Sequence, residues 1–257
     1  MTGCDYVNLW GFLSSSPVDD RFKQKDSLKN YNPPVITDQN NFSFLVISDT
    51  HYYNSQPYYI KSIDANKTTW DLSFVIIAGD IVQAGMQDQF DLAAADFATT
   101  TLPVYPVIGN HDLFNNGFEI YRNVFGRTVY DMKIGNMLHM IFIDTANGTV
   151  GELQMNWLEN ILKGSDAKYR IVFSHYNLTD SEEWQTFTTY SYPDEVYYLF
   201  NLFDTYNVDY CVAGHLHEYD LKDIRGTKYF ILNNYADNDK NHLLISVKNG
   251  NLEYSFF

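Results

Sequence analysis

The sequence predicts an α/β protein, in which buried strands alternate with helices. Short apolar runs of strand length recur along the 257 residues, and segments between several of them place their apolar residues at the helical period. In addition, polar Asp, His or Asn residues follow most of the apolar runs directly. Ligands in α/β sheets collect at the carboxyl ends of strands, so this pattern predicts a site built from several strand ends.

The strands are expected in the larger, C-terminal part of the chain. The first forty residues are expected to be irregular, because the breakers Ser14-Ser15-Ser16-Pro17 and Asn32-Pro33-Pro34 interrupt a mostly polar stretch. Apolar runs then predict successive strands at 42–47, 73–78, 102–108, 137–143, 169–173 and 208–213. The tail 227–257 is expected to be rich in strands. We therefore expect an irregular segment over 1–40 and a single domain over 41–257.

Helices are expected between these strands, at 57–69, 87–100, 151–163 and 193–206. The clearest is the third, whose apolar side chains fall on one helical face at Leu153, Trp157, Leu158, Ile161 and Leu162. Gly164 follows directly and is a typical helix stop.

The composition narrows the classes of function. The chain carries 17 Lys and Arg against 32 Asp and Glu, which gives a formal net charge of −15. Nucleic-acid binding needs a positive face, so binding of a nucleic acid by bulk charge is not expected. A small anionic substrate stays compatible with this charge, because a metal site can reverse the sign locally. No apolar run of about 18 residues is present, so no transmembrane helix is expected.

The two cysteines cannot form a disulfide framework. Cys211 lies in an apolar run and is expected to be a buried, inert thiol. The start Met1-Thr2-Gly3-Cys4 resembles the end of a bacterial lipoprotein signal, although the preceding apolar stretch is missing. Two alternatives follow: a lipid anchor at Cys4 with residues 1–40 as a membrane tether at the bacterial cell envelope, or an ordinary N-terminus on a cytoplasmic protein.

The polar residues at the strand ends form a typical set of metal ligands. They supply carboxylate oxygens, one amide oxygen and imidazole nitrogens, from Asp49, His51, Asp80, Asn110, His175, His215 and His217. This mixture suits Mn, Fe or Zn better than metals that prefer thiolates. Seven ligands are too many for one tetrahedral site and fit two metal ions that share one ligand. A carboxylate can be that shared ligand, because it has two oxygens.

Each motif alone also has an ordinary structural explanation. Asp49-Thr50-His51 could be a solvated strand end, Gly79-Asp80 a turn, and His175 a structural histidine. Gly214-His215-Leu216-His217 is less common, because it places two imidazoles two residues apart at a strand exit. The combination carries the prediction: five of the seven histidines stand at strand ends. His139, inside a predicted strand, is expected in the core or at an edge, and His242 is expected to be solvated.

In order and spacing, these motifs resemble the five blocks of the calcineurin-like metallophosphoesterase family. The blocks are Asp49-x-His51, Gly79-Asp80, Gly109-Asn110-His111-Asp112, Ser174-His175 and Gly214-His215-x-His217. The resemblance covers about residues 42–220. It implies a four-layer α/β sandwich of two mixed β-sheets flanked by helices, the metallophosphoesterase fold.

The resemblance also implies a role for each motif residue. Asp49, His51 and His217 would hold one metal, Asn110, His175 and His215 would hold the other, and Asp80 would bridge them. His111 would face the substrate and stabilise or protonate the leaving oxygen, and Asp112 would orient it. Purple acid phosphatases have a tyrosine ligand three residues after the bridging Asp, where this chain has Gln83. The Asp-x-His motif instead resembles bacterial phosphodiesterase-type members.

The expected activity is hydrolysis of a phosphodiester or phosphomonoester by in-line attack of a metal-bridging hydroxide. The cofactors would be two divalent or trivalent ions, with Mn, Fe or Zn favoured, and the partner a small phosphate ester. One alternative is a non-catalytic surface lipoprotein that uses the fold as a metal- or ligand-binding module. The His111-Asp112 pair counts against it, because a binding module needs no acid catalyst. Another is a nuclease of the same family, against which the net charge of −15 counts. The sequence does not predict the oligomeric state.

Overall fold

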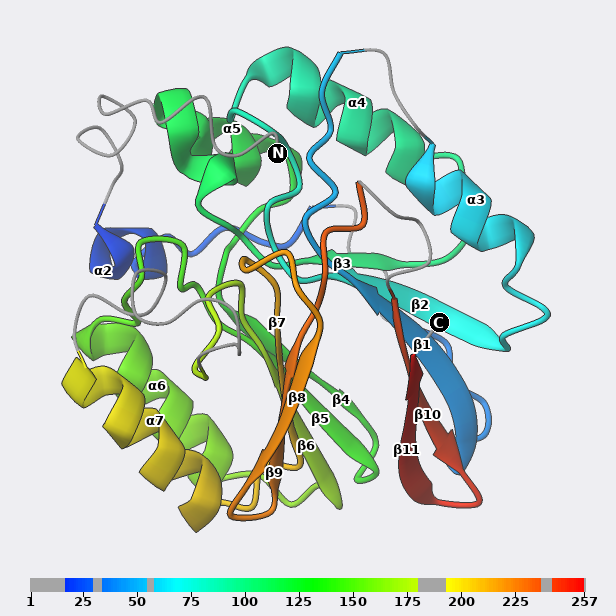
Figure 1. Ribbon diagram of the computed structural model, residues 1–257, viewed down its shortest axis with the longest axis vertical. Coiled ribbons are helices and arrows are strands. Elements are labelled where there is room, and N and C mark those ends of the chain that lie inside the picture. The colour runs from blue at the N-terminus through cyan, green and yellow to red at the C-terminus, as the bar shows by residue number, and fades with distance from the viewer. Residues whose placement is uncertain (1–16, 30–33, 55–57, 180–192, 237–241, 257) are drawn as a thin grey trace.

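Two β-sheets pack face to face between two layers of helices. A computed structural model describes residues 17–29, 34–54, 58–179, 193–236 and 242–256. Large side chains from both sheets, Phe44, Phe74, Phe142 and Phe173 among them, form one buried cluster between the sheets. A second cluster lies between the first sheet and its helices, and a third lies between the second sheet and its helices. The molecule is therefore the expected four-layer α/β sandwich (Figure 1).

The first sheet has the strand order β11-β10-β1-β2-β3. Its parallel centre consists of β1 (Asn41–Ile47), β2 (Leu72–Ile77) and β3 (Val104–Pro106). The antiparallel strands β10 (Leu243–Lys248) and β11 (Asn251–Phe256) complete it. The polar residues that follow β1, β2 and β3 consequently emerge at the same edge.

The second sheet has the order β4-β5-β6-β7-β9-β8. The parallel strands are β5 (Leu138–Phe142), β6 (Tyr169–Phe173), β7 (Tyr210–Ala213) and β9 (Thr227–Ile231). Antiparallel strands close both edges, namely β4 (Tyr130–Ile134) and β8 (Asp220–Ile224). Both sheets are mixed, as expected.

Helices cover the two outer faces. Beside the first sheet lie α3 (Tyr59–Ala65), α4 (Gln87–Phe97), the 3-10 turn η1 (His111–Asn116) and α5 (Gly117–Val124). Beside the second sheet lie α6 (Glu152–Lys163) and α7 (Pro193–Thr205). Among the residues described, no helix is both long and apolar enough to cross a membrane.

The structure corrects several expectations. The segment 1–40, expected to be irregular, contains the helix α2 (Val18–Phe22), which packs against α6. Helix α5 and the edge strands β4 and β8 were not expected. Residues 1–16 lie outside the described part of the chain, so the anchor at Cys4 and the tether stay predictions.

Two of the three structural predictions for single side chains are confirmed. His139 is buried in β5, with Nδ1 2.8 Å from Ser165 Oγ and Nε2 3.0 Å from Asp131 Oδ2. Cys211 is a buried free thiol, and burial raises its pKa to about 12. The solvated position expected for His242 is wrong: its side chain is buried, with its ring 5.0 Å from that of Trp70.

Candidate metal centre

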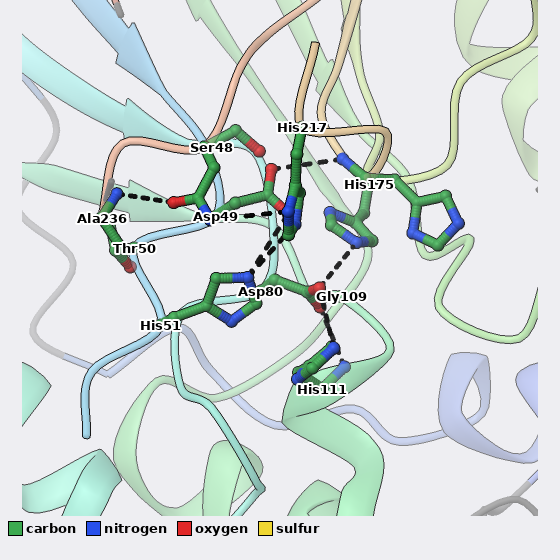
Figure 2. Close-up of polar contacts among 12 residues, drawn as sticks. Ser48, Asp49, Thr50, His51, Asp80, Gly109, His111, His175, His217 and Ala236 are labelled. Atoms are coloured by element: carbon green, nitrogen blue, oxygen red, sulfur yellow. Dashed lines mark hydrogen bonds and ion pairs between the residues drawn. The ribbon is translucent and has the colours of Figure 1, made fainter. Parts of the chain in front are cut away.

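The seven expected metal ligands lie together where the carboxyl ends of both sheets meet. Their imidazoles and carboxylates converge in Figure 2, from loops that follow β1, β2, β6 and β7. Asn110 joins them from the loop after β3. Segments separated by more than 160 residues in the sequence therefore contribute to one cluster.

The backbone at this cluster is held in an uncommon conformation. Five of the seven expected ligands have positive φ angles: 54° at Asp49, 43° at His51, 49° at Asp80, 76° at His215 and 55° at His217. Non-glycine residues rarely adopt this left-handed region, and it costs free energy unless the surrounding structure enforces it. Such strain concentrates at functional sites, which supports a functional role for this cluster.

One donor set consists of Asp49, His51 and His217. Nε2 of His217 lies 3.2 Å from Asp49 Oδ1 and 3.3 Å from Nε2 of His51. Asp49 is fully buried, and neither its Oδ1 nor Nδ1 of His51 makes a hydrogen bond. Two imidazole nitrogens and a buried carboxylate oxygen therefore point at one small volume.

The second donor set consists of Asn110, His175 and His215. The amide oxygen of Asn110 lies 3.1 Å from His175 Nε2 and 3.0 Å from His215 Nδ1. His175 Nδ1 donates to the carbonyl oxygen of Ala78 at 2.9 Å, so its Nε2 faces the cluster. Figure 2 shows this imidazole turned toward Asp80.

Asp80 lies between the two sets. Its Oδ2 is 3.2 Å from His175 Nε2. One donor atom from each of Asp80, His51 and His111 also lies within 4.8 Å of the other two. Asp80 Oδ1 accepts a hydrogen bond from the His111 main-chain N–H at 2.9 Å. Of the expected ligands, this carboxylate is therefore placed as a shared ligand would be.

Glycines allow the loops to approach one another this closely. A Cβ at Gly109 would lie 2.2 Å from Asp80 Oδ1, and one at Gly214 would lie 2.4 Å from Asp49 Oδ2. Gly79 combines a φ of 92° with a hypothetical Cβ only 2.3 Å from Nδ1 of His175. A side chain at any of these positions would displace an expected ligand.

The cluster requires positive charge. Burial disfavours the ionised forms of Asp49 and Asp80, but the neighbouring His217 and His175 outweigh it and hold both carboxyl pKa values below the usual range. The same contacts, working against burial, raise the pKa of His175 to about 9 and that of His217 above its ordinary value. The two buried carboxylates thus favour the protonated forms of these two imidazoles in the metal-free protein.

The other two histidines of the donor sets are neutral. Burial lowers the pKa of His51 to about 4, and burial together with His175 lowers that of His215 to about 3. Neutral imidazole is the form that binds metals. Orphaned buried atoms, convergent nitrogen and oxygen donors and buried carboxylates all fit divalent cations, so these residues are suited to hold metal ions.

His111 borders the cluster and is partly exposed. Its Nε2 lies 3.9 Å from Asp80 Oδ2, and its Nδ1 lies 2.6 Å from the main-chain oxygen of Gln83. A carbonyl oxygen only accepts, so Nδ1 carries the hydrogen and Nε2 faces the cluster. The ring of Phe114 packs beside it at 4.7 Å.

The imidazole of His111 is held by the Gln83 carbonyl, whereas Asp112, expected to orient it, makes its hydrogen bonds elsewhere. The two carboxylate oxygens of Asp112 accept hydrogen bonds from the main-chain N–H groups of Val82 at 2.9 Å and Gly109 at 2.8 Å. Asp112 is fully buried, and burial together with Asp80 raises its pKa to about 8. It therefore joins the loop that carries Asp80 to the loop that carries Asn110, while the Gln83 carbonyl holds His111.

Three residues that were not among the expected site residues support the cluster. Thr145 Oγ1 accepts hydrogen bonds from the main-chain N–H groups of His175 at 3.1 Å and Tyr176 at 2.9 Å. The Tyr176 ring stacks on that of His215 at 3.9 Å. Asn234, after β9, lies 3.5 Å from His217 Nδ1. Their signal is positional, since each follows a strand of the second sheet at the same edge.

Comparison with known proteins agrees with the geometry. The family model for calcineurin-like phosphoesterases matches residues 42–219, a range that contains every expected ligand. A curated protein from Fibrobacter succinogenes, described as "Probable cyclic nucleotide phosphodiesterase", is 26% identical over 113 residues. That match covers 41% of this chain and 42% of the relative, so the chain spans less than half of the relative's length.

Solved structures share the fold at low sequence identity. A purple acid phosphatase from yellow lupin seeds superposes with a TM-score of 0.68 at 16% identity, over 84% of this chain and 51% of the phosphatase. The structure of PhoD gives a TM-score of 0.64 at 12% identity, over 90% of this chain and 70% of PhoD. These neighbours establish the metallophosphoesterase fold.

Proposed function

The chain belongs to the calcineurin-like phosphoesterase family, and on that premise we propose that it hydrolyses small phosphate esters with two metal ions at the strand-end cluster. One observation carries the proposal: two donor sets lie on either side of a single carboxylate, Asp80. Asp49, His51 and His217 would hold one ion, and Asn110, His175 and His215 the other. When bound, the ions would supply a nucleophile at neutral pH and positive charge for the phosphoryl oxygens.

The chain's own residues would orient and complete the reaction. His111 presents Nε2 to the cluster because Nδ1 is bound to Gln83. A proton on Nε2 would pass to the leaving oxygen, which needs one when the ester is cleaved. Asp112 would act indirectly, by keeping the loops of Asp80 and Asn110 together. His111 is therefore the proposed catalytic residue and Asp112 a positioning residue.

We propose a small phosphodiester as the substrate class. The description of the Fibrobacter relative supports this class and includes cyclic nucleotides in it. The net charge of −15 disfavours long polyanions, whereas two bound divalent ions would make the cluster locally attractive to one phosphate group. A family nuclease is therefore the less favoured candidate.

A substrate panel tests the proposal. Protein treated with EDTA and reloaded with Mn²⁺ is offered cyclic nucleotides, glycerophosphodiesters, nucleotides and a chromogenic phosphodiester. Hydrolysis of diesters by the wild type, and its loss in Asp80→Ala, would support the proposal. Full activity in Asp80→Ala would contradict the mechanism. Stoichiometric metal with no hydrolysis of any ester would favour the non-catalytic binding module.

A further inference from the structure

We propose that the N-terminal brace, defined as residues 17–29, positions the second donor set of the metal cluster through Arg21. The inference rests on the proposed function, since it assigns Asn110, His175 and His215 to one metal ion. The brace lies entirely outside residues 42–219, the range that the family model matches. Its contribution is therefore separate from the motifs that carry the family resemblance.

The brace is anchored by a buried ion pair. Arg21 donates from Nε to Asp144 Oδ2 and from Nη2 to Asp144 Oδ1, both at 2.7 Å, and the side chains are 0% and 1% exposed. The same guanidinium donates to Asn147 and lies 5.9 Å from the ring centre of Phe118 in α5. A bidentate pair of this kind fixes the orientation of both partners.

Helix α2 also packs closely against the start of α6. Asp19 Oδ1 accepts a hydrogen bond from the main-chain N–H of Leu153 at 3.1 Å. Gly151, with φ at 74°, passes so close that a Cβ there would lie 2.6 Å from Asp19 Oδ1. Figure 1 shows α2 beside α6 and below α5, where it contacts both helical layers.

A short path of contacts leads from Arg21 to the second donor set. Asp144 stands two residues after the end of β5, and its main-chain N–H and C=O are both bonded to the buried side chain of Gln154. The next residue, Thr145, accepts the main-chain N–H groups of His175 and Tyr176, and the Tyr176 ring stacks on His215. The turn held by Arg21 therefore supports two expected ligands of one metal ion.

The first donor set has a separate support. The main-chain oxygens of Ser48 and Asp49 accept hydrogen bonds from the N–H groups of Tyr235 and Ala236, which follow β9. Figure 2 shows the contact between Asp49 and Ala236 beside the first set. Loss of Arg21 is therefore expected to loosen one metal site and leave the other unchanged.

The test is a Mn²⁺ titration of EDTA-treated, full-length Arg21→Met protein by isothermal calorimetry. His215→Ala and His217→Ala serve as references that identify the binding steps of the second and first donor sets. We expect Arg21→Met to weaken the step lost in His215→Ala by roughly tenfold, the lower end of the range for direct partners of a metal ligand, because Arg21 acts through Asp144 and Thr145. The other step should keep its wild-type affinity.

The matched control is Arg122→Met. Arg122, in α5, pairs with Asp26 of the same brace and with Glu119, and none of its described contacts is with Asp144. Both Mn²⁺ steps should keep their wild-type affinity in this variant. If Arg21→Met does not fold, the double variant Arg21→Met/Asp144→Asn removes the buried unpaired carboxylate as well and is titrated instead.

The outcomes separate the inference from the proposed function. Two unchanged Mn²⁺ steps in Arg21→Met, or equal weakening of both steps, would overturn the role of the brace. Selective weakening of the His215-dependent step would establish it. Wild-type protein that binds no Mn²⁺ would instead refute the proposed function itself.

Discussion

Nδ1 of His111 lies 2.6 Å from the main-chain oxygen of Gln83 and donates to it. This contact orients the imidazole without a carboxylate partner and leaves Nε2 facing Asp80. A histidine held in this way can carry a proton on Nε2 toward a leaving oxygen. Because the partner is a carbonyl, the orientation does not depend on the side chain at position 83.

The variant His111→Asn should lower kcat for a phosphodiester with an alkyl leaving group by about 10²–10⁴-fold, the usual contribution of a general acid. For an ester of p-nitrophenol the loss should be smaller, because that leaving group departs without a proton. Steady-state kinetics on both esters check this prediction.

Metal content decides between two roles for His111. One imidazole nitrogen of His111 lies within 4.8 Å of donor atoms of His51 and Asp80, so this residue is close enough to be a metal ligand. If His111→Asn keeps two ions per chain, the acid role stands. A lost ion, or an equal loss of kcat on both esters, would show that His111 is not the leaving-group acid.

Asp112→Asn should destabilise the protein rather than misorient His111. The amide nitrogen of Asn would face a main-chain N–H of Val82 or Gly109, so one buried hydrogen bond is lost. We expect the free energy of unfolding to fall by about 1–3 kcal/mol in urea denaturation. An unchanged unfolding midpoint with a large fall in kcat would instead point to an action through His111.

Gly79→Ala and Gly226→Ala form a matched pair. Their φ angles are 92° and 90°, so the backbone strain of an added side chain is alike. At Gly79 the new Cβ would meet His175 Nδ1 at 2.3 Å, whereas nothing lies within 4 Å at Gly226. Gly226→Ala should therefore keep two bound ions and Gly79→Ala should lose the ion of the second donor set, as measured by metal analysis. Equal metal content in the two variants would disprove this.

Metal-free protein should be most stable near pH 6.5. The folded-state pKa of His175 is raised from 6.5 to about 9, so the folded protein holds a proton that the unfolded chain releases. Its contribution is complete below pH 6.5 and disappears as the pH rises through about 9, at about 1.4 kcal/mol per pH unit. The pKa values of His51 and His215 are lowered to about 4 and about 3, so their effect on stability runs in the opposite direction. Because the unfolded chain binds these two protons more readily, stability is lost as the pH falls below 6.5.

Thermal unfolding in EDTA between pH 5 and 9 measures this profile. Saturating Mn²⁺ should reduce the alkaline loss, because a bound ion replaces the proton on His175. The smaller loss from Asp112, whose pKa is raised to about 8, should remain up to about pH 8. A metal-free Tm that keeps rising toward pH 9 would show that His175 is not protonated in the folded protein.

The strands that carry the site and the seven candidate ligands were predictable because each motif directly follows an apolar run of strand length. The α/β alternation alone places such residues at one edge, and the family resemblance adds the second sheet and the division of the ligands into two donor sets. The position of His139 in the core or at a strand edge was equally predictable, because this residue lies inside an apolar run. Local pattern and position were sufficient for these features.

Other features depend on contacts that local patterns do not encode. Arg21 and Asp144 are 123 residues apart and both charged, so nothing in either segment indicates a buried pair. The partner of His111 is a main-chain oxygen, which has no residue signature. His242 was expected in solvent because it opens a C-terminal strand, but it packs on Trp70 from a distant segment. Strand β8 is polar throughout most of its length and lies at a sheet edge.

The central claim is a phosphoesterase that needs two metal ions sharing Asp80. Its most direct test is to add Mn²⁺ stepwise to EDTA-treated protein while the hydrolysis of a chromogenic phosphodiester is followed. The account predicts no hydrolysis without metal and a rate that rises to a plateau at two equivalents per chain. A plateau at one equivalent, or hydrolysis that persists in EDTA, would contradict it.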